Sequence, residues 1–469
     1  MSTTPSPYTP KYCFWRTPEG RPHREPNTKF ALDELLAEWG RASRVDAQGN
    51  VSLQGFASIQ IEAALKLAFV VVEPGDAELD DHDAWGIANH ALRHVAFANG
   101  GSKPIANLDF IREADKRAAT FFRQTKRKFV FVTSLSVAKF PAKAITISGC
   151  KIRQLSSRKK FRPPAFVVST QVASIYRTHV ESTRYCWIAV DTEGRTTSEA
   201  FNRAFEAVGL LRSLWTLVAT SGMSSISFGS GPTQPLSAVH TGPVHTLHEP
   251  SGKPVSEDFF WQDDDPRPDR RLFAPTNGWV PIEKMRKRIL RKIASLPYRE
   301  DLVPLLQRYG SALDLTNHDL LLLQVWSVLE RAMNSVGIRY DDVIKMATWF
   351  MADRPLVKQL LECIRLQRNR FVHSSQNASQ SEQIGYLVKS ILEKHLWALI
   401  GNRFKVASLA EYAELLSQPV DPSALHKRRR HLTHAFDLHV PPPTKPGAST
   451  TPPSRSPPTA PNPITPAPP

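Results

Sequence analysis

The first 125 residues carry their apolar side chains mainly at helical spacing. Four runs, at 32–39, 59–68, 84–98 and 105–122, place apolar residues three or four positions apart. In a helix of about 3.6 residues per turn this spacing gathers the side chains on one face, which can pack on a core. Residues 1–27 are rich in proline and polar residues, so we expect them to lie over the surface. The pattern predicts a mainly helical region over 1–125.

The pattern changes after residue 125. Four short runs rich in β-branched residues, at 128–137, 144–152, 165–170 and 185–194, have the length of strands. A long amphipathic helix is predicted over 198–219, because its large apolar residues recur every three or four positions. Residues 221–275 are rich in Gly, Pro and Ser with further short apolar runs, which is typical of strands and loops. We therefore expect a mixed α+β region over 126–275.

Helical spacing returns for the last part of the chain. A basic helix is predicted over 282–295, and further helices cover most of the sequence to 418. Their starts are marked by capping or first-turn residues: Thr316 or Asn317, Asp341, Pro355, and Ser379 with Glu382 as a capping box. Residues 282–418 are thus predicted to form an all-α helical bundle.

Residues 419–469 are basic at first and then dominated by proline, with Ser, Thr and Ala between. Such a composition cannot bury a core, so a disordered or polyproline II tail is expected. The predicted fold class is a multidomain protein with a helical N-terminal region, a mixed α+β middle region, an all-α helical-bundle C-terminal domain and a disordered Pro-rich tail.

Charge adds a class of partner to this picture. The 469 residues carry a formal net charge of +16 with a pI near 9.7, which favours polyanions such as RNA. The four cysteines are scattered and form no C-x-x-C pair, so we expect neither a disulfide framework nor a cysteine zinc site. This cysteine usage is typical of a protein in the reducing cytoplasm, where we expect this chain to act. The longest apolar run, 63–72, is about half the length of a membrane span, so no membrane association is expected.

The hexapeptide RNRFVH, at 368–373, has the most specific chemistry in the chain. It ends an amphipathic helical run over 355–371 and supplies an arginine, an amide and a histidine. Histidine titrates near neutral pH, and arginine binds phosphate with fixed geometry. The same arginine-to-histidine spacing also occurs near the N-terminus and in the basic tail, at Arg429 and His434, so the spacing alone does not define a site. Only Arg368 and His373 stand inside a predicted bundle.

The block from about 282 to 418 resembles the HEPN family of helical-bundle proteins, which includes RNase toxins and phage-defence proteins. The resemblance rests on RNRFVH, which fits the family's R-x4-6-H motif. The upstream segment from Trp326 to Glu330 looks like the leading helix of the ApeA-like branch. The family implies a homodimer that joins two such motifs and cleaves RNA without a metal, by attack of the neighbouring 2′-hydroxyl.

The resemblance implies a role for each matched residue. His373 would be the general acid or base, and Arg368 would stabilise charge on the phosphate oxygens. Asn369 would orient the phosphate or the histidine, and Glu330 would position either. The alternative is that Arg368 and His373 only complement a helix C-terminus, where the helix dipole favours cations. On an ideal helix the two side chains point about 140° apart, so convergence on one phosphate requires a distorted last turn or a second copy of the motif.

Other basic and histidine clusters complete the candidates. Two basic stretches are expected to contact an RNA backbone, although each could equally be a solvated face: Lys284, Arg286, Lys287 and Arg288, and Arg158, Lys159 and Lys160. Two histidine groups are candidate metal ligands: Asp83 with His90 and His94, and His240 with His245 and His248. Neither group has a recognisable complete ligand set, so we expect no metal and no cofactor.

The sequence therefore favours a metal-independent endoribonuclease of the HEPN type, a homodimer acting on RNA. Residues up to about 280 would sense a phage or host trigger molecule or position the RNA, and the family suggests a regulated toxin or antiphage defence effector. The alternative is a non-catalytic nucleic-acid-binding or adaptor protein that uses the bundle for dimerisation. A metal-dependent enzyme built on His90 and His94 is a third, weaker hypothesis.

Overall fold

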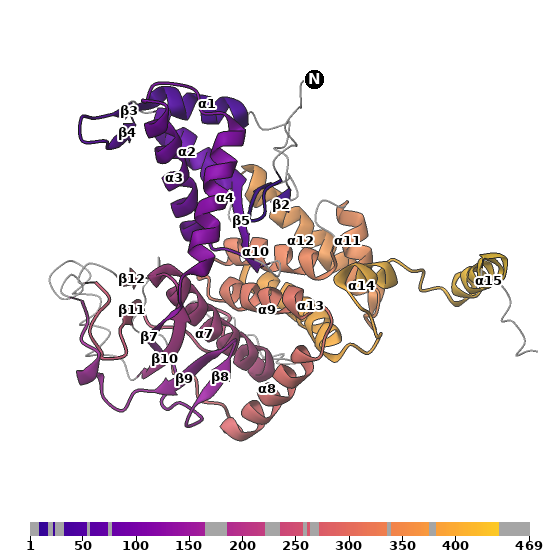
Figure 1. Ribbon diagram of the computed structural model, residues 1–469. Helices are drawn as coiled ribbons and strands as arrows, with labels where there is room; N and C mark the ends of the chain where they lie inside the picture. The colour runs from indigo at the N-terminus through magenta and orange to yellow at the C-terminus, as the bar shows by residue number, and fades with distance from the viewer. Residues whose placement is uncertain are drawn as a thin grey trace, which may run out of the picture.

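The computed structural model describes residues 9–16, 22–23, 32–53, 57–73, 77–164, 185–220, 235–256, 260–262, 272–334, 339–374 and 381–439. Helices and strands are mixed along the chain, and two large hydrophobic cores divide the described residues into two packed units. A third, smaller cluster includes Val130 and Val132 of the second unit. The first unit lies within residues 9–124 and the second within 127–418. Figure 1 shows the first unit in indigo and purple above the sheet of the second, with the later helices in orange beside that sheet.

The N-terminal unit, which the sequence predicted to be mainly helical, combines four described helices with a small sheet. Its helices are α1 (Leu32–Ala42), α2 (Ala57–Ala68), α3 (Asp81–Ala98) and α4 (Asn107–Arg123). The sheet has the order β2-β1-β5-β6, formed by Pro22–His23, Cys13–Arg16, Phe69–Glu73 and Ala77–Glu78, and β3 (Ser43–Val45) pairs with β4 (Val51–Leu53). The run 63–72 was expected to be one apolar stretch, but it divides between α2 and β5 because β-branched residues fill its second half.

Strand β1 is attached to the helices by a single carboxylate. Asp115 on α4 accepts hydrogen bonds from the backbone N–H groups of Lys11, Tyr12 and Cys13, at 2.7 to 3.2 Å. The strand thereby places Trp15 in the core of this unit, where its ring contacts Phe110. The proline-rich start of the chain is therefore part of the fold at least from residue 9.

The second unit is built on a six-stranded antiparallel sheet. The strand order is β12-β11-β7-β10-β9-β8, formed by Phe260–Gln262, Val244–His248, Arg127–Leu135, Cys186–Gly194, Cys150–Gln154 and Ile145–Ile147. Two of the four strand-length runs, 128–137 and 185–194, are thus confirmed as strands. The run 144–152 is instead a hairpin of β8 and β9, and the run 165–170 lies outside the described residues. The β8–β9 turn uses Ser148 and Gly149 with φ of 49° and 77°, the left-handed conformation that tight hairpins need.

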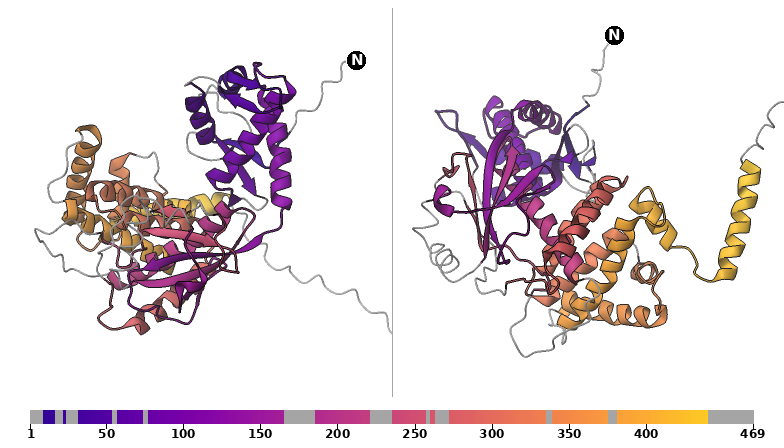
Figure 2. Two further views of the ribbon diagram at one scale, coloured as in Figure 1. Left: turned by 90° about the vertical axis from the view of Figure 1, so that its left-hand side faces the viewer. Right: turned by 90° about the horizontal axis from the view of Figure 1, so that it is seen from below.

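Helix α7 (Thr197–Thr220) joins the sheet to the C-terminal helices. It packs against β10 on one side and against α8 (Trp279–Ala294) and α9 (Arg299–Leu313) on another. The remaining helices are α10 (His318–Ala332), α11 (Tyr340–Ala347), α12 (Arg354–Ser374), α13 (Ser381–Gly401) and α14 (Leu409–Leu416). One continuous core runs from Phe129 to Leu416, so the predicted 126–275 and 282–418 regions form one packed unit. The right-hand view of Figure 2 shows the helices on one side of the sheet.

The last described helix corrects the predicted tail. Residues 422–439 form helix α15 (Pro422–His439), which Figure 1 draws apart from the rest of the molecule. Ala, Leu, Lys and Arg favour a helix here, and Asp421 accepts a hydrogen bond from the backbone N–H of Ala424 in its first turn. Residues 440–469 lie outside the described part. None of the helices described in the structure is both long and apolar enough to cross a membrane.

Candidate functional site

The hexapeptide 368–373 lies on an unbroken helix. α12 is α-helical from Arg354 to Ser374, so the backbone shows no distorted last turn around the motif. Pro355 occupies the first turn as predicted, where its missing N–H costs no hydrogen bond. The side chains from residue 370 onward in this helix, including that of His373, lie outside the described part. With regular geometry, positions 368 and 373 face directions about 140° apart.

Arg368 is held against an aromatic ring. Its guanidinium lies 4.9 Å from the centre of the Tyr340 ring, and its Nη1 donates to the Tyr340 hydroxyl. Tyr340 begins α11, so this contact joins α11 to α12. The Nε of Arg368 is buried and has no hydrogen-bond partner among the described residues. The arginine is therefore fixed in place with a donor still unsatisfied.

A chain of contacts links Arg368 to Glu330. The Tyr340 ring lies 6.3 Å from the Trp326 ring on α10, measured between centroids. The Nε1 of Trp326 donates to Glu330 one turn later, at 2.8 Å. Glu330 and Arg368, both named from the sequence, therefore belong to one cluster contributed by α10, α11 and α12. The sequence did not identify Tyr340, since only the fold brings it to Arg368.

The basic stretch on α8 separates into buried and exposed cations. Arg286 is 4% exposed, and Glu283 accepts two hydrogen bonds from it at 2.8 Å. The same carboxylate accepts a 2.7 Å hydrogen bond from Nε1 of Trp215. Arg286 is thus part of an internal ion pair, which corrects the prediction that it contacts RNA at the surface. Lys284, Lys287 and Arg288 are exposed.

The second basic stretch forms a short 3₁₀ helix, η1 (Arg158–Lys160), next to the sheet. The guanidinium of Arg158 lies 4.9 Å from the centre of the Trp187 ring on β10. The Nζ of Lys160 lies 5.5 Å from the Phe161 ring, and Lys159 is exposed. Cations and aromatic rings alternate here, as the sequence indicated.

Three histidines of the sheet region are buried and hydrogen-bonded to other groups. His240 and His245 contact the hydroxyls of Ser237 and Thr133 at 2.9 and 2.8 Å. His248 contacts the Thr246 hydroxyl at 2.8 Å, and burial lowers its pKa to about 4. These partners give each ring a structural role, so the three do not converge as metal ligands.

The other histidine group is also divided. Asp83 is buried and accepts a 2.6 Å hydrogen bond from the Thr196 hydroxyl, whereas His90 and His94 are exposed. Asp83 is therefore bonded to Thr196 of the second unit and does not form a metal site with the two histidines. Across the described residues, no three His, Cys, Asp or Glu side chains are close enough together to hold a metal ion.

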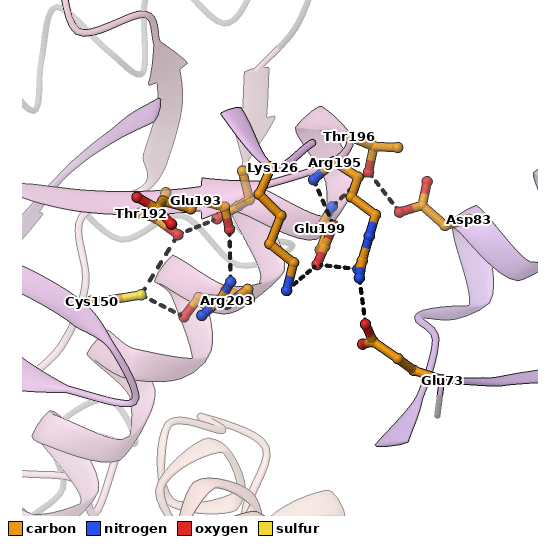
Figure 3. A network of polar contacts seen from close by, with 11 residues as sticks. Glu73, Asp83, Lys126, Cys150, Thr192, Glu193, Arg195, Thr196, Glu199 and Arg203 are labelled. Carbon is orange, nitrogen blue, oxygen red and sulfur yellow. Dashed lines mark hydrogen bonds and ion pairs between the residues drawn. The ribbon is translucent and has the colours of Figure 1, made fainter. Parts of the chain in front are cut away.

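A polar network that the sequence analysis did not identify joins the two units (Figure 3). Arg195 follows β10 and donates to Glu73, at the end of β5, and to Glu199, at 3.0 Å. Lys126, just before β7, lies 3.5 Å from the same Glu199 carboxylate. The Arg195 guanidinium also lies 5.3 Å from the ring of Phe122 on α4. One buried arginine thus contacts both units.

The same junction contains a carboxyl group that titrates near neutral pH. Thr196 donates to Asp83 on α3, and burial raises the pKa of this carboxyl to about 7. Thr196 also accepts from the backbone N–H of Glu199 at 3.0 Å, and Glu199 accepts from the backbone N–H of Arg195 at 2.6 Å. The T-x-x-E pattern at the start of α7 forms half of a capping box, because Thr196 accepts from the backbone N–H of Glu199 while Glu199 accepts from the residue before the cap. The pattern is visible in the sequence, but the link from Thr196 to Asp83 is not.

Comparison of the chain with protein-family models, with curated proteins and with solved structures found no match.

Proposed function

We propose that this chain is a metal-independent endoribonuclease of the HEPN type that acts in the cytoplasm as a homodimer. The observation that carries the proposal is the Arg368 cluster: an arginine of the R-x4-6-H motif held against Tyr340, on an unbroken helix that continues through His373. Residues up to about 280 sense a trigger or position the RNA. Its role as a regulated toxin or antiphage effector rests on the family resemblance.

The chemistry needs few groups. The 2′-oxygen of the RNA attacks the adjacent phosphorus, and the bond from phosphorus to the 5′-oxygen breaks as the new bond forms. A proton leaves the 2′-hydroxyl and another reaches the 5′-oxygen, giving a 2′,3′-cyclic phosphate and a 5′-hydroxyl. His373 transfers one of these protons, since imidazole titrates near pH 6.5. Arg368 stabilises the charge on the phosphate oxygens, with Asn369 and Glu330 positioning the reacting groups.

The helix geometry supports a dimeric site. Because α12 is regular, side chains at 368 and 373 point about 140° apart and cannot both reach one phosphate from the same helix. A two-fold axis beside α12 would bring Arg368 of one protomer opposite His373 of its partner. The proposed active site is therefore composite, with each phosphate held between two chains.

The decisive experiment compares two histidines with the same upstream arginine spacing. Purified wild type, His373→Ala and His434→Ala are incubated with single-stranded RNA in EDTA; His434 lies five residues after Arg429 on exposed α15 and is the matched control. Wild type and His434→Ala are expected to cleave equally, and His373→Ala at least about 100-fold more slowly. Products should carry cyclic phosphate ends. No cleavage by wild type, or equal cleavage by His373→Ala, refutes the catalytic assignment.

Complementation tests the composite site. Arg368→Ala and His373→Ala are each expected to be inactive alone. When the two are refolded together, random pairing gives about half heterodimers with one complete site of two, so about a quarter of wild-type activity should return. The composite site is overturned if the refolded mixture recovers no cleavage activity although a tagged pull-down demonstrates heterodimers. That result would mean that the arginine and the histidine act within one chain.

The second candidate is a non-catalytic RNA-binding or adaptor protein. It is favoured by the exposed cations of α8 and by Arg158 beside Trp187, which bind a backbone without cleaving it. It predicts salt-sensitive RNA binding that weakens in Lys284→Ala/Arg288→Ala and is unchanged in Arg368→Ala and His373→Ala.

A further inference from the structure

A hollow lies between α8 and the C-terminal end of α13, next to the turn after α13. Its volume is about 1270 Å³. Pockets for small molecules usually measure ~300 to 1,000 Å³, so this hollow is larger than a single small ligand needs. We propose that it binds a segment of unpaired RNA through its phosphates and bases. The proposal deepens the proposed function by assigning a substrate-positioning site.

The cations around the hollow come from three segments. Arg288, Arg291 and Lys292 lie on one face of α8, Lys394 lies on α13, and Arg403 follows α13. All five are exposed, and no acidic side chain lines the hollow among the described residues. Within the described residues, none of the five makes an ion pair with a carboxylate. Like charges gathered in this way repel one another unless an anion lies between them.

Helix dipoles account for only part of this charge. Arg291 and Lys292 occupy the last turn of α8, where cations are favourable without any ligand. Lys394 lies about two turns before the end of α13, and α13 has no basic residue in its last turn. Arg403 lies beyond that helix. Helix capping therefore does not explain all five cations, and we attribute the cluster to binding of an anion.

Aromatic rings in the same hollow specify the kind of anion. Phe350 and Trp397 are half-buried, and Phe404 is 39% exposed. All three line the hollow, and the Phe350 and Phe404 rings lie 6.4 Å apart between centroids. Exposed rings beside cations bind unpaired nucleic acid, because bases stack on the rings while the cations hold the phosphates. A phosphorylated protein or a lipid headgroup would use the cations and leave the rings unoccupied.

The hollow is distinct from the proposed catalytic cluster. It is lined by Phe350, just before α12, whereas Arg368 lies well along that helix. Fourteen residues of helix separate Arg354 from Arg368, a distance of about 21 Å at about 1.5 Å per residue. A strand bound here would be positioned without touching the reacting atoms. Changes in the hollow are therefore expected to raise KM and leave kcat unchanged.

Binding is measured on the full-length chain with a fluorescent single-stranded RNA of about 12 nucleotides that carries 2′-O-methyl groups. This probe lacks the attacking hydroxyl, so binding is measured whether or not the chain is a nuclease. Lys394→Ala/Arg403→Ala is compared with Lys427→Ala/Arg430→Ala, which removes one lysine and one arginine of exposed α15. The first pair should weaken binding at least about tenfold and lower the salt slope by about 1.4, and the control pair should change neither.

Phe404→Leu tests stacking, since it keeps an apolar side chain but removes the ring. It should weaken the same probe by roughly tenfold. Unfolding midpoints equal to wild type establish that each variant is folded. The proposal is overturned if the two charge pairs have equal effects, if Phe404→Leu binds as wild type, or if AMP displaces the probe at equal concentration, which would assign the hollow to free nucleotides.

Discussion

Replacing Arg286 by alanine distinguishes an internal ion pair from a surface RNA contact. Its guanidinium is bound by both carboxylate oxygens of Glu283, inside the core that α8 shares with α7. In Arg286→Ala the Glu283 carboxylate stays buried, and among the described residues only Nε1 of Trp215 still donates a hydrogen bond to it. A buried charge without its counter-ion is costly because the protein interior solvates it poorly.

The size of the effect follows from this burial. Removing one partner of a buried ion pair costs about 3 to 5 kcal/mol of unfolding free energy. At the size of the 127–418 unit, each kcal/mol lowers the melting temperature by roughly 2 °C, so a decrease of about 6 to 10 °C is expected. Lys287→Ala removes an exposed neighbour of the same charge type and should change stability by less than about 0.5 kcal/mol.

Thermal unfolding followed by circular dichroism measures both variants. A double variant, Glu283→Gln with Arg286→Met, removes both charges and should recover most of the lost stability, since no buried charge is left unpaired. The internal ion pair is refuted if Arg286→Ala has the same melting temperature as Lys287→Ala and binds RNA more weakly than wild type. In that case Arg286 contacts RNA at the surface, as the sequence predicted.

Three further predictions concern backbone packing and titration. Gly310→Ala should lower the unfolding free energy by about 1 to 3 kcal/mol, because its Cβ would overlap the Ser213 hydroxyl on α7. Gly209→Ala has open space around the new Cβ and should stabilise the protein by up to about 1 kcal/mol. Equal effects of the two variants in urea unfolding would refute the close approach of α9 to α7 at Gly310. The pKa of Asp83 is raised to about 7, so the folded state binds a proton that the unfolded state has lost, and stability falls as pH rises from about 4 to about 7. The stability of Asp83→Asn relative to wild type should therefore grow between pH 5 and pH 8. A difference that stays constant over this range would contradict the raised pKa. Burial lowers the pKa of His395 to about 4, so stability is lost as pH falls from about 6.5 towards 4, and His395→Gln should show a smaller loss in the same urea titration.

The sequence determined the local elements of this protein. Runs of β-branched residues at strand length located β7 and β10, and three- to four-residue spacing located α7. The Asn317 side chain caps α10 by accepting from two backbone N–H groups; the residue types had left Thr316 and Asn317 as the two candidates for this cap. Arg368 and Glu330 were named from a motif and a resemblance. Each of these signals lies within a few consecutive residues, where chain connectivity fixes the geometry.

Only the tertiary structure decided what each face meets. The periodicity of α8 shows which residues lie on one face, but Arg286 is internal because Trp215 and Glu283, 68 residues apart in sequence, meet there. Thr196 reaches Asp83 across 113 residues, and Tyr340 reaches Arg368 across 28. Helical and strand periods constrain neighbours three or four positions away, whereas long-range partners depend on how whole elements pack. For this reason the sequence identified the segments of the candidate site, and the fold supplied their partners.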